Sequence, residues 1–402
     1  MFLQRSGSCR LSLGISISHN FYEAEDLLNI LSPHLDRCER IIVRLDGPSH
    51  TLKLLPFPGT LSSLRVFDCD SLFPISNLTL LSPQTRSPLE VFISTSRGGW
   101  GPETTLRKAL GHLDPDHLRV LILCSEWLER MDWVAASRYT ELELLEVGCA
   151  GETLLWSIEE DSDLPTIQFN RLLKLTLYGQ VSGCLIPPIL RADSLRHLCI
   201  DVHHGILEPR GASAFHVVEQ RWRTPHFPNL RSCIIRAQWG FPIELLSSFI
   251  KSHRNLIAVE LPLCYFGTLK YLQLPDGQSN VLSSLKLLRL RIKQFDMLYL
   301  PDELAADIAD DLEYLCDGRV TWGFKLEILY SREWRSGGPI ADMLRRSRTL
   351  SFQIPCEEEC VGIPAEDSWN RVLLDGGEVE EVLNLGRRDT IFSQCQYAPP
   401  IF

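Results

Sequence analysis

The chain has 402 residues, of which 45% are apolar and 23% charged, an ordinary globular composition. Its net charge of −11 argues against a general binder of nucleic acid or of anionic membranes. No stretch approaches the roughly 20 consecutive apolar residues that a membrane-spanning helix needs, and residues 1–18 lack the pattern of a signal peptide. The 13 scattered cysteines favour a reducing compartment over a disulfide framework. We therefore expect a soluble intracellular protein, in the cytoplasm or the nucleus.

The first elements predicted from the sequence are a strand, a helix and a second strand. Apolar residues alternate over Leu11–Ile17, which indicates a strand. Asn20 can cap a helix that continues to about Leu31. The segment Cys38–Leu45 has the composition of another strand.

A pattern of the form apolar-x-x-apolar-x-apolar returns along most of the chain, and is clear at Leu64, Phe67 and Cys69. The copies begin at Leu64, Leu89, Leu118, Leu142, Leu172, Leu195, Leu230, Leu256 and Leu285, with an earlier match at Cys38 and a further one at Leu326. Successive starts from Leu64 to Leu285 are 23–35 residues apart, against roughly 20–29 in leucine-rich repeats. The last two apolar positions share one face of a strand, and stacked copies bury a continuous core.

The pattern predicts an α/β fold: an irregular leucine-rich-repeat-like solenoid, or horseshoe. A parallel sheet is expected on its concave face, with mixed helices and loops on its convex face. Helical spacing is found near residues 104–113, 242–250 and 302–315. The alternative is an ordinary α/β domain whose strands happen to be rich in leucine.

The predicted organisation is one solenoid domain over residues 1–355, followed by an acidic segment at 356–402. Residues 351–402 contain ten Asp or Glu residues and three Arg. Leu350–Ile354 alternates like a last strand. Beyond it the periodicity fades, and we interpret 356–402 as a cap or a partly disordered tail.

Two stretches resemble a known family. The segment from Leu3 to Leu13 (LQRSGSCRLSL) and the segment from Leu31 to Ile41 (LSPHLDRCERI) are similar to F-box/leucine-rich-repeat-like proteins of mushroom-forming fungi. Ser194-Leu195-Arg196 and Asn229-Leu230-Arg231 are similar to the repeat starts of that family. The resemblance implies substrate recognition for ubiquitin ligation. Family members carry an F-box upstream of the Arg-Ser-Gly segment, and Met1 stands two residues before Leu3, so we expect the adaptor-docking helices to be missing.

Motifs that would indicate catalysis or a bound group are weak in this sequence. His203 and His204 are adjacent but have no third ligand at useful spacing, and Cys356 and Cys360 lack a second Cys or His pair for zinc. The sequon at Asn77 is expected to be unused without a secretory signal. We expect no enzymatic activity, no catalytic residue, no cofactor and no metal.

The surface most suited to binding a protein is the concave sheet face, because horseshoe repeats commonly bind partners there. Residues of the strands that point away from the expected core are Lys174, Thr176, Tyr178, His197, Asp201, Arg236, Glu260, Arg289 and Arg291. Tyr and Arg are favoured in interfaces, and Arg236, Arg289 and Arg291 suggest a positive strip for an acidic peptide. We expect a monomer that binds an unidentified protein, without nucleic acid or membrane. The alternative function is a protein-interaction scaffold with no link to a ligase.

Overall fold

The computed structural model describes thirteen stretches of the chain, which contain its strands. They are residues 7–17, 30–45, 62–71, 88–96, 115–125, 134–149, 167–179, 190–202, 227–237, 249–250, 252–262, 284–292 and 325–330. The chain divides into two compact units. Unit 1 contains Met1–Ser194 together with Val382–Phe402, and unit 2 contains Leu195–Glu381. Each unit is described by itself below.

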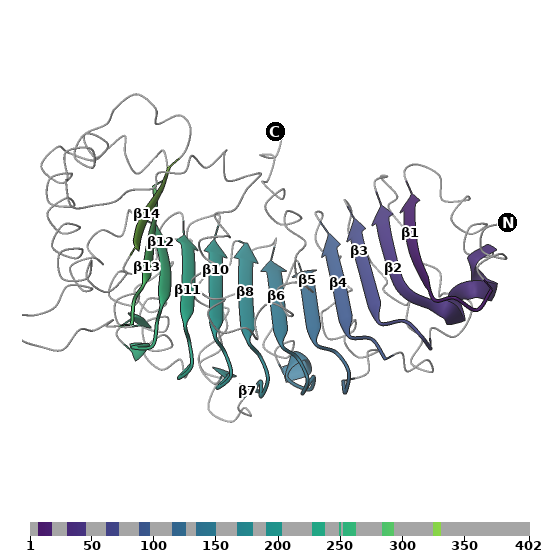
Figure 1. Ribbon diagram of the computed structural model, residues 1–402, viewed down its shortest axis with the longest axis horizontal. Coiled ribbons are helices and arrows are strands. Elements are labelled where there is room, and N and C mark those ends of the chain that lie inside the picture. Colours follow the sequence, from purple (N-terminus) through teal and green to yellow (C-terminus); the bar gives the residue numbers. More distant parts are fainter. Residues whose placement is uncertain are drawn as a thin grey trace, which may run out of the picture. The chain divides into compact units, whose positions relative to one another are not determined.

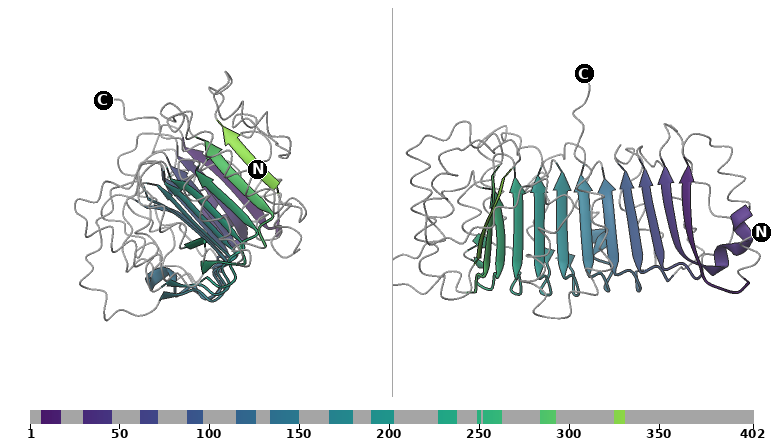
Figure 2. Two further views of the ribbon diagram at one scale, coloured as in Figure 1. Left: turned by 90° about the vertical axis from the view of Figure 1, so that its left-hand side faces the viewer. Right: turned by 45° about the horizontal axis from the view of Figure 1, so that its top comes forward.

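Unit 1 is built around a sheet of parallel strands that neighbour one another in chain order (Figure 1). The strands are β1 (Leu11–Ile17), β2 (Cys38–Leu45), β3 (Val66–Ser71), β4 (Val91–Ser96), β5 (Val120–Ser125), β6 (Leu144–Cys149) and β8 (Lys174–Gly179). The 3-10 helix η1 (Ser32–Arg37) leads directly into β2. All arrows of this sheet point the same way in both views (Figures 1 and 2), as expected for stacked repeats.

Unit 2 repeats the arrangement with five strands. They are β10 (His197–Val202), β11 (Ser232–Ala237), β12 (Ala258–Pro262), β13 (Leu287–Ile292) and β14 (Lys325–Tyr330). Each pairs in parallel with the next along the chain. Both units are therefore parallel-sheet solenoids, and the solenoid prediction is confirmed at that level.

The register of the strands explains why the leucine spacing matters. Parallel pairing places the second apolar position of each copy beside its equivalent in the next strand. In unit 1 this buried row is Phe67, Phe92, Leu121, Leu145 and Leu175. The rings of Phe67 and Phe92 stack with centroids 5.7 Å apart. Burying one such side chain stabilises the fold by about 1.5–3 kcal/mol, so the row is a main source of cohesion between repeats.

The same row continues within unit 2, where it is formed by Leu198, Cys233, Val259, Leu288 and Leu326. All five side chains are buried. Burial raises the pKa of the Cys233 thiol far above its usual value. Cys233 is therefore a core thiol.

A buried position that the leucine pattern does not include lies three residues before the first leucine of several copies. It is occupied by Tyr139, Phe169, Ala192, Phe227 and His253. At three of these the carbonyl oxygen accepts a hydrogen bond from the leucine amide, which closes a turn: Leu142 to Tyr139 (3.2 Å), Leu230 to Phe227 (3.1 Å) and Leu256 to His253 (3.3 Å). These side chains fill the core beneath the strand starts.

His253 is the polar member of that set. Its ring is tilted against Phe249 at a centroid distance of 4.2 Å and stacks on Phe227 at 6.0 Å. Its Nδ1 lies 2.7 Å from the carbonyl oxygen of Phe249, so Nδ1 carries the proton and donates it. The imidazole thus packs as an aromatic ring while its polar atom is satisfied.

The strand predictions that fall on described residues are confirmed, including Leu11–Ile17 and Cys38–Leu45. A strand also forms at the predicted late copy, but its register places Leu326 beside Leu288, at the second apolar position and not at the start of a copy. Two short strands were not predicted: β7 (Ile167–Gln168) and β9 (Leu190–Arg191) form a separate parallel pair in unit 1. The helices expected near 104–113 and 302–315, and the strand at Leu350–Ile354, lie outside the described residues. Within the described stretches, no helix is long and apolar enough to cross a membrane.

Candidate functional site

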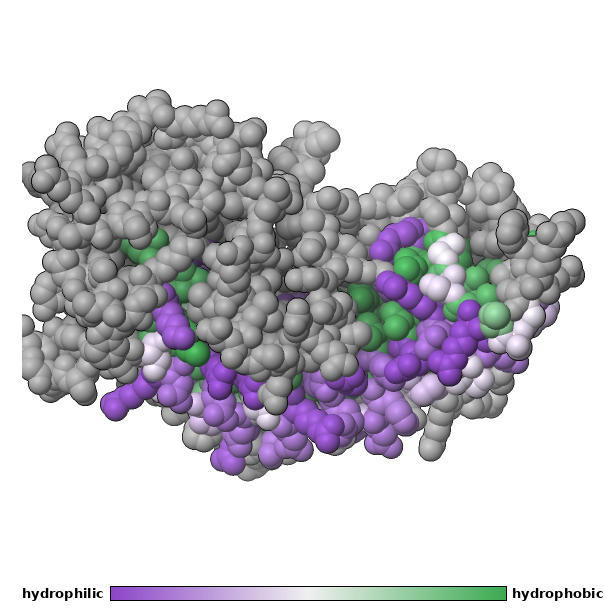
Figure 3. Space-filling model, viewed as in Figure 1, coloured by the Kyte–Doolittle hydropathy of each residue, from purple (hydrophilic) through white to green (hydrophobic). Residues whose placement is uncertain are grey.

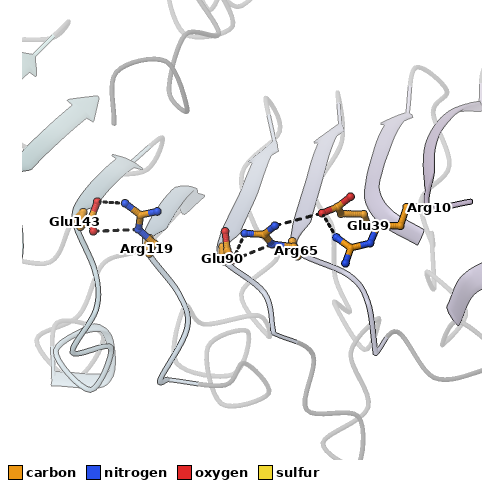
Figure 4. Close-up of polar contacts among 6 residues, drawn as sticks. All are labelled: Arg10, Glu39, Arg65, Glu90, Arg119 and Glu143. Carbon is orange, nitrogen blue, oxygen red and sulfur yellow. Dashed lines mark hydrogen bonds and ion pairs between the residues drawn. The ribbon is translucent and has the colours of Figure 1, made fainter. Parts of the chain in front are cut away.

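The most regular polar feature of unit 1 is a row of alternating charges at the starts of the strands, which we call the charge ladder. Its members are Arg10, Glu39, Arg65, Glu90, Arg119 and Glu143, drawn in Figure 4. From Glu39 onward, each occupies the position directly after the first apolar residue of a copy. Neighbouring strands in a sheet lie about 4.8 Å apart, so equivalent side chains come within reach of one another.

Glu39 and Arg65 are the central contacts of the ladder. One carboxylate oxygen of Glu39 lies 3.0 Å from Nη1 of Arg10 and 3.3 Å from Nη1 of Arg65. Arg65 also donates from Nε to Glu90 at 2.8 Å, and its Nη2 contacts the same oxygen. The hydrogen bonds to Glu90 are the main reason why the pKa of the Arg65 guanidinium is raised.

The last pair of the ladder is bidentate and less exposed. Arg119 donates from Nε and Nη2 to the two carboxylate oxygens of Glu143, at 3.0 and 2.9 Å. Two parallel charge-assisted hydrogen bonds fix the guanidinium in one plane. Arg171 and Glu141, just outside the ladder, form another ion pair. This edge of unit 1 is therefore densely charged, and charges of opposite sign are paired along it. Figure 3 shows a hydrophilic band along the strand starts.

Backbone hydrogen bonds hold the ladder in register. The amide of each ladder residue donates to the carbonyl oxygen of the preceding one: Arg65 to Glu39, Glu90 to Arg65, Arg119 to Glu90 (each 2.9 Å) and Glu143 to Arg119 (2.8 Å). At three of these carbonyls the next amide along the chain donates as well, for example Val91 to Arg65 at 3.0 Å. The spacing of the charges is thus set by the main chain.

The sheet face of unit 1 that lies opposite the leucine core is apolar at its centre. Val91, Ile93, Val120, Ile122 and Leu144 form a buried cluster there, in contact with Val66 and Leu173. Strands with apolar residues on both faces are typical of parallel sheets. Figure 3 shows hydrophobic side chains gathered over the N-terminal strands.

An ion pair flanks this apolar centre on each side. Arg44 of β2 and Asp68 of β3 approach to 3.2 Å, and Lys174 of β8 and Glu146 of β6 approach to 3.1 Å. Asp68 and Glu146 are both buried. The apolar centre of this face is therefore a second buried layer of the sheet, bordered by two ion pairs whose carboxylates are also buried.

The predicted binding residues of unit 1 lie on β8. Lys174 pairs with Glu146, as above, and Thr176 is buried, with no hydrogen-bond partner for its Oγ1 among the described atoms. Tyr178 is on the same strand, and its side chain lies outside the description. Lys174 and Thr176 therefore lie two residues apart on the face of β8 that is opposite Leu175 and Leu177, and Thr176 is not accessible there.

The predicted residues of unit 2 fall on four of its strands, β10 to β13. Nδ1 of His197 lies 2.8 Å from Oγ of Ser232, which is its register partner on β11. Asp201 and Arg236 are paired in register on β10 and β11, and Arg291 lies on β13. The side chains of these three are not among those described.

Glu260 and Arg289, also predicted, form an ion pair inside unit 2. They are opposite one another on β12 and β13, and Nη1 of Arg289 lies 3.3 Å from a carboxylate oxygen of Glu260. The side chains are 0% and 3% exposed. Ala258 and Leu287, which precede them on the same face, form a buried apolar pair against Ile234. The charge of Arg289 is therefore balanced within unit 2.

Among the side chains that the structure describes, no group of three His, Cys, Asp or Glu residues could hold a metal ion. His203, His204, Cys356, Cys360 and Asn77 lie outside the described residues. Cys9 is exposed, Cys38 is buried, and burial raises the pKa of the Cys38 thiol.

The predicted site residues did not include the charge ladder. Its signal is present in the sequence, because the residue after the first apolar position reads Glu, Arg, Glu, Arg, Glu over five successive copies. An alignment of the copies shows this alternation, whereas a search for motifs within one copy does not.

Comparison of the chain with models of known protein families gives no match, and comparison with curated proteins gives no significant match. The resemblance to the F-box/leucine-rich-repeat-like proteins therefore rests only on the residues quoted for it, and it stays a prediction.

Proposed function

We propose that this chain is a protein-binding module of the leucine-rich-repeat type. The observation that carries the proposal is the register of the strands: equivalent residues of successive repeats form continuous rows at fixed spacing. The charge ladder of unit 1, whose side chains are partly exposed, is such a row. Repeat proteins use rows of this kind as extended surfaces for a partner.

The second part of the proposal concerns the biological role of this protein binding. The stretches that resemble the fungal family include Leu31–Ile41, which lies in η1 and β2 of unit 1. That resemblance supports a role in selecting proteins for ubiquitination, in the cytoplasm or the nucleus. In the alternative function, the chain is a scaffold without a link to a ligase, and it would bind its partners through the same surfaces. The experiment below distinguishes the two roles.

The proposal is tested by affinity capture of the tagged full-length chain from a cell lysate, with the tag alone as the control bait. The captured proteins are identified by mass spectrometry. We expect a reproducible set of partners absent from the control. A ligase adaptor and a cullin in that set would support substrate recognition for ubiquitination. Partners without these two would support the scaffold. A set identical to that of the tag alone would refute protein binding.

A further inference from the structure

The strand-start edge of unit 2 differs in charge from that of unit 1. The position occupied by the charge ladder in unit 1 holds Arg196, Arg231, Ile257 and Lys286 in the copies of unit 2. The backbone places these residues in one row by the same hydrogen bonds: the amide of Arg231 donates to Arg196 (2.9 Å), that of Ile257 to Arg231 (2.7 Å) and that of Lys286 to Ile257 (2.8 Å). Where unit 1 alternates in sign, the three charged residues of this row in unit 2 are all cations, and Ile257 is neutral.

A fourth cation lies at the same edge. Arg254 is in the turn that the hydrogen bond from Leu256 to His253 closes, directly before β12. The side-chain amide of Asn255 in that turn donates to the carbonyl oxygen of Pro228 at 3.1 Å. This bond joins the turn before β12 to the turn before β11, and so holds Arg254 near the strand start of Arg231.

The cations of this edge face solvent. Arg231, Arg254 and Lys286 are exposed and Arg196 is half-buried. Arg196 and Lys286 each have a further interaction within the chain. Arg231 and Arg254 are therefore the two cations of this edge best suited to binding a partner.

The described side chains of unit 2 provide no exposed acidic group at this edge. Glu260 is their one carboxylate, and it is buried against Arg289. Around Arg231 and Arg254, the described side chains of unit 2 therefore include no exposed carboxylate that would balance these two cations. A positive strip was predicted for Arg236, Arg289 and Arg291. Arg289 is buried against Glu260, and the exposed cations among the described side chains of unit 2 lie at the strand starts.

We propose that this edge, centred on Arg231 and Arg254, binds an acidic peptide segment of a protein partner. Arg guanidinium groups recognise carboxylates by paired hydrogen bonds. Rows spaced by about 4.8 Å per strand suit an extended chain that presents several carboxylates. A nucleic acid would also be attracted to cations, but the net charge of −11 opposes a polyanion as long as a nucleic acid. This inference depends on the proposed function, and it specifies the kind of peptide that one surface of the chain would bind.

The test measures binding of a fluorescein-labelled 12-residue peptide of alternating Glu and Ser to the purified full-length chain, by fluorescence anisotropy. A peptide with Gln in place of Glu is the uncharged control. We expect binding of the Glu peptide that weakens as salt rises, because rim charges are screened. In the charge-reversal variant Arg231→Glu/Arg254→Glu the affinity should fall about tenfold or more, since two attractive contacts become repulsive.

The matched control is Arg40→Glu/Arg138→Glu, which reverses two exposed cations of unit 1 and changes the net charge by the same amount. It should keep the affinity of the unaltered chain. Equal weakening in both variants would show an unspecific charge effect and would overturn the proposal. Absence of peptide binding would overturn it too.

Two further results separate the alternatives. A labelled single-stranded oligonucleotide that binds more tightly than the peptide, and is lost in Arg231→Glu/Arg254→Glu, would assign the edge to nucleic acid and refute the peptide. Partners captured from lysate together with no peptide binding would overturn this inference alone and leave the proposed function standing.

Discussion

The buried ion pair of Glu260 and Arg289 allows a quantitative test of what holds unit 2 together. At a separation of 3.3 Å, two unit charges attract by about 5 kcal/mol at an effective dielectric constant of about 20. Removing both ions from water costs several kcal/mol for each, so the pair adds little net stability. Removing one partner alone leaves the other charge buried, and that costs about 3–5 kcal/mol.

We therefore predict strong coupling between two substitutions. Glu260→Leu and Arg289→Met should each lower the free energy of unfolding by about 3–5 kcal/mol, whereas the double variant should be about as stable as the unaltered chain, or more stable. Urea unfolding followed by circular dichroism and by fluorescence of the tryptophans measures these values, and the double-mutant cycle gives the coupling. Additive losses in the double variant would refute the reasoning, because they would mean that the two charges do not depend on one another.

The pH dependence of Arg289→Met gives an independent check. Without Arg289, burial raises the folded-state pKa of the Glu260 carboxyl above the unfolded value of about 4.3. A group with a raised folded pKa contributes its full stability below the unfolded pKa and loses it as the pH rises, by about 1.4 kcal/mol per pH unit. The single variant should thus regain stability toward pH 4 relative to pH 7, and the double variant should show no such change.

Three other predictions follow from unit 1 and from the core thiols. Phe92→Ala should lower the free energy of unfolding by about 3–5 kcal/mol, because it removes a buried ring from the row between repeats; a loss below 1 kcal/mol in urea unfolding would contradict that packing. Arg119→Met should cost only about 1 kcal/mol in low salt and less in 1 M salt, since the pair with Glu143 is partly exposed and screened; an unchanged cost in high salt would speak against an ionic origin. Iodoacetamide should label Cys9 in the folded chain at pH 8 but reach Cys233 only in urea, because burial raises the pKa of that thiol and blocks access; mass spectrometry detects the labelled peptides, and early labelling of Cys233 would contradict its burial.

The interior row could be predicted because its periodicity is strong and repeated. Leu64, Phe67 and the equivalent residues of later copies fall on one face at fixed spacing. When the copies stack in parallel and in register, this face is the one that is buried. By contrast, β7 and β9 have two residues each, too few for any alternation to be read. His253 was not predicted as a core residue because histidine is polar, and its packing against Phe249 and Phe227 depends on the turn before β12.

The binding surface was less predictable than the fold. That Glu260 and Arg289 are neighbours follows from their equivalent places in successive copies, but periodicity alone does not specify that both side chains are buried. Arg231 and Arg254 were not among the predicted binding residues for a different reason. Those predictions considered alternate residues within the strands, whereas these two cations precede the strands.

The charge ladder of unit 1 also constrains how many repeats the array can contain. Deleting the single repeat that carries Glu90 would bring Arg65 next to Arg119, and like charges on neighbouring strands are destabilising. Deleting that repeat together with the next one would bring Arg65 next to Glu143 and keep the alternation. During folding, a strand that skipped its neighbour would meet the same repulsion. Because the signs alternate, we expect this part of the chain to tolerate the gain or loss of two neighbouring repeats better than the gain or loss of one.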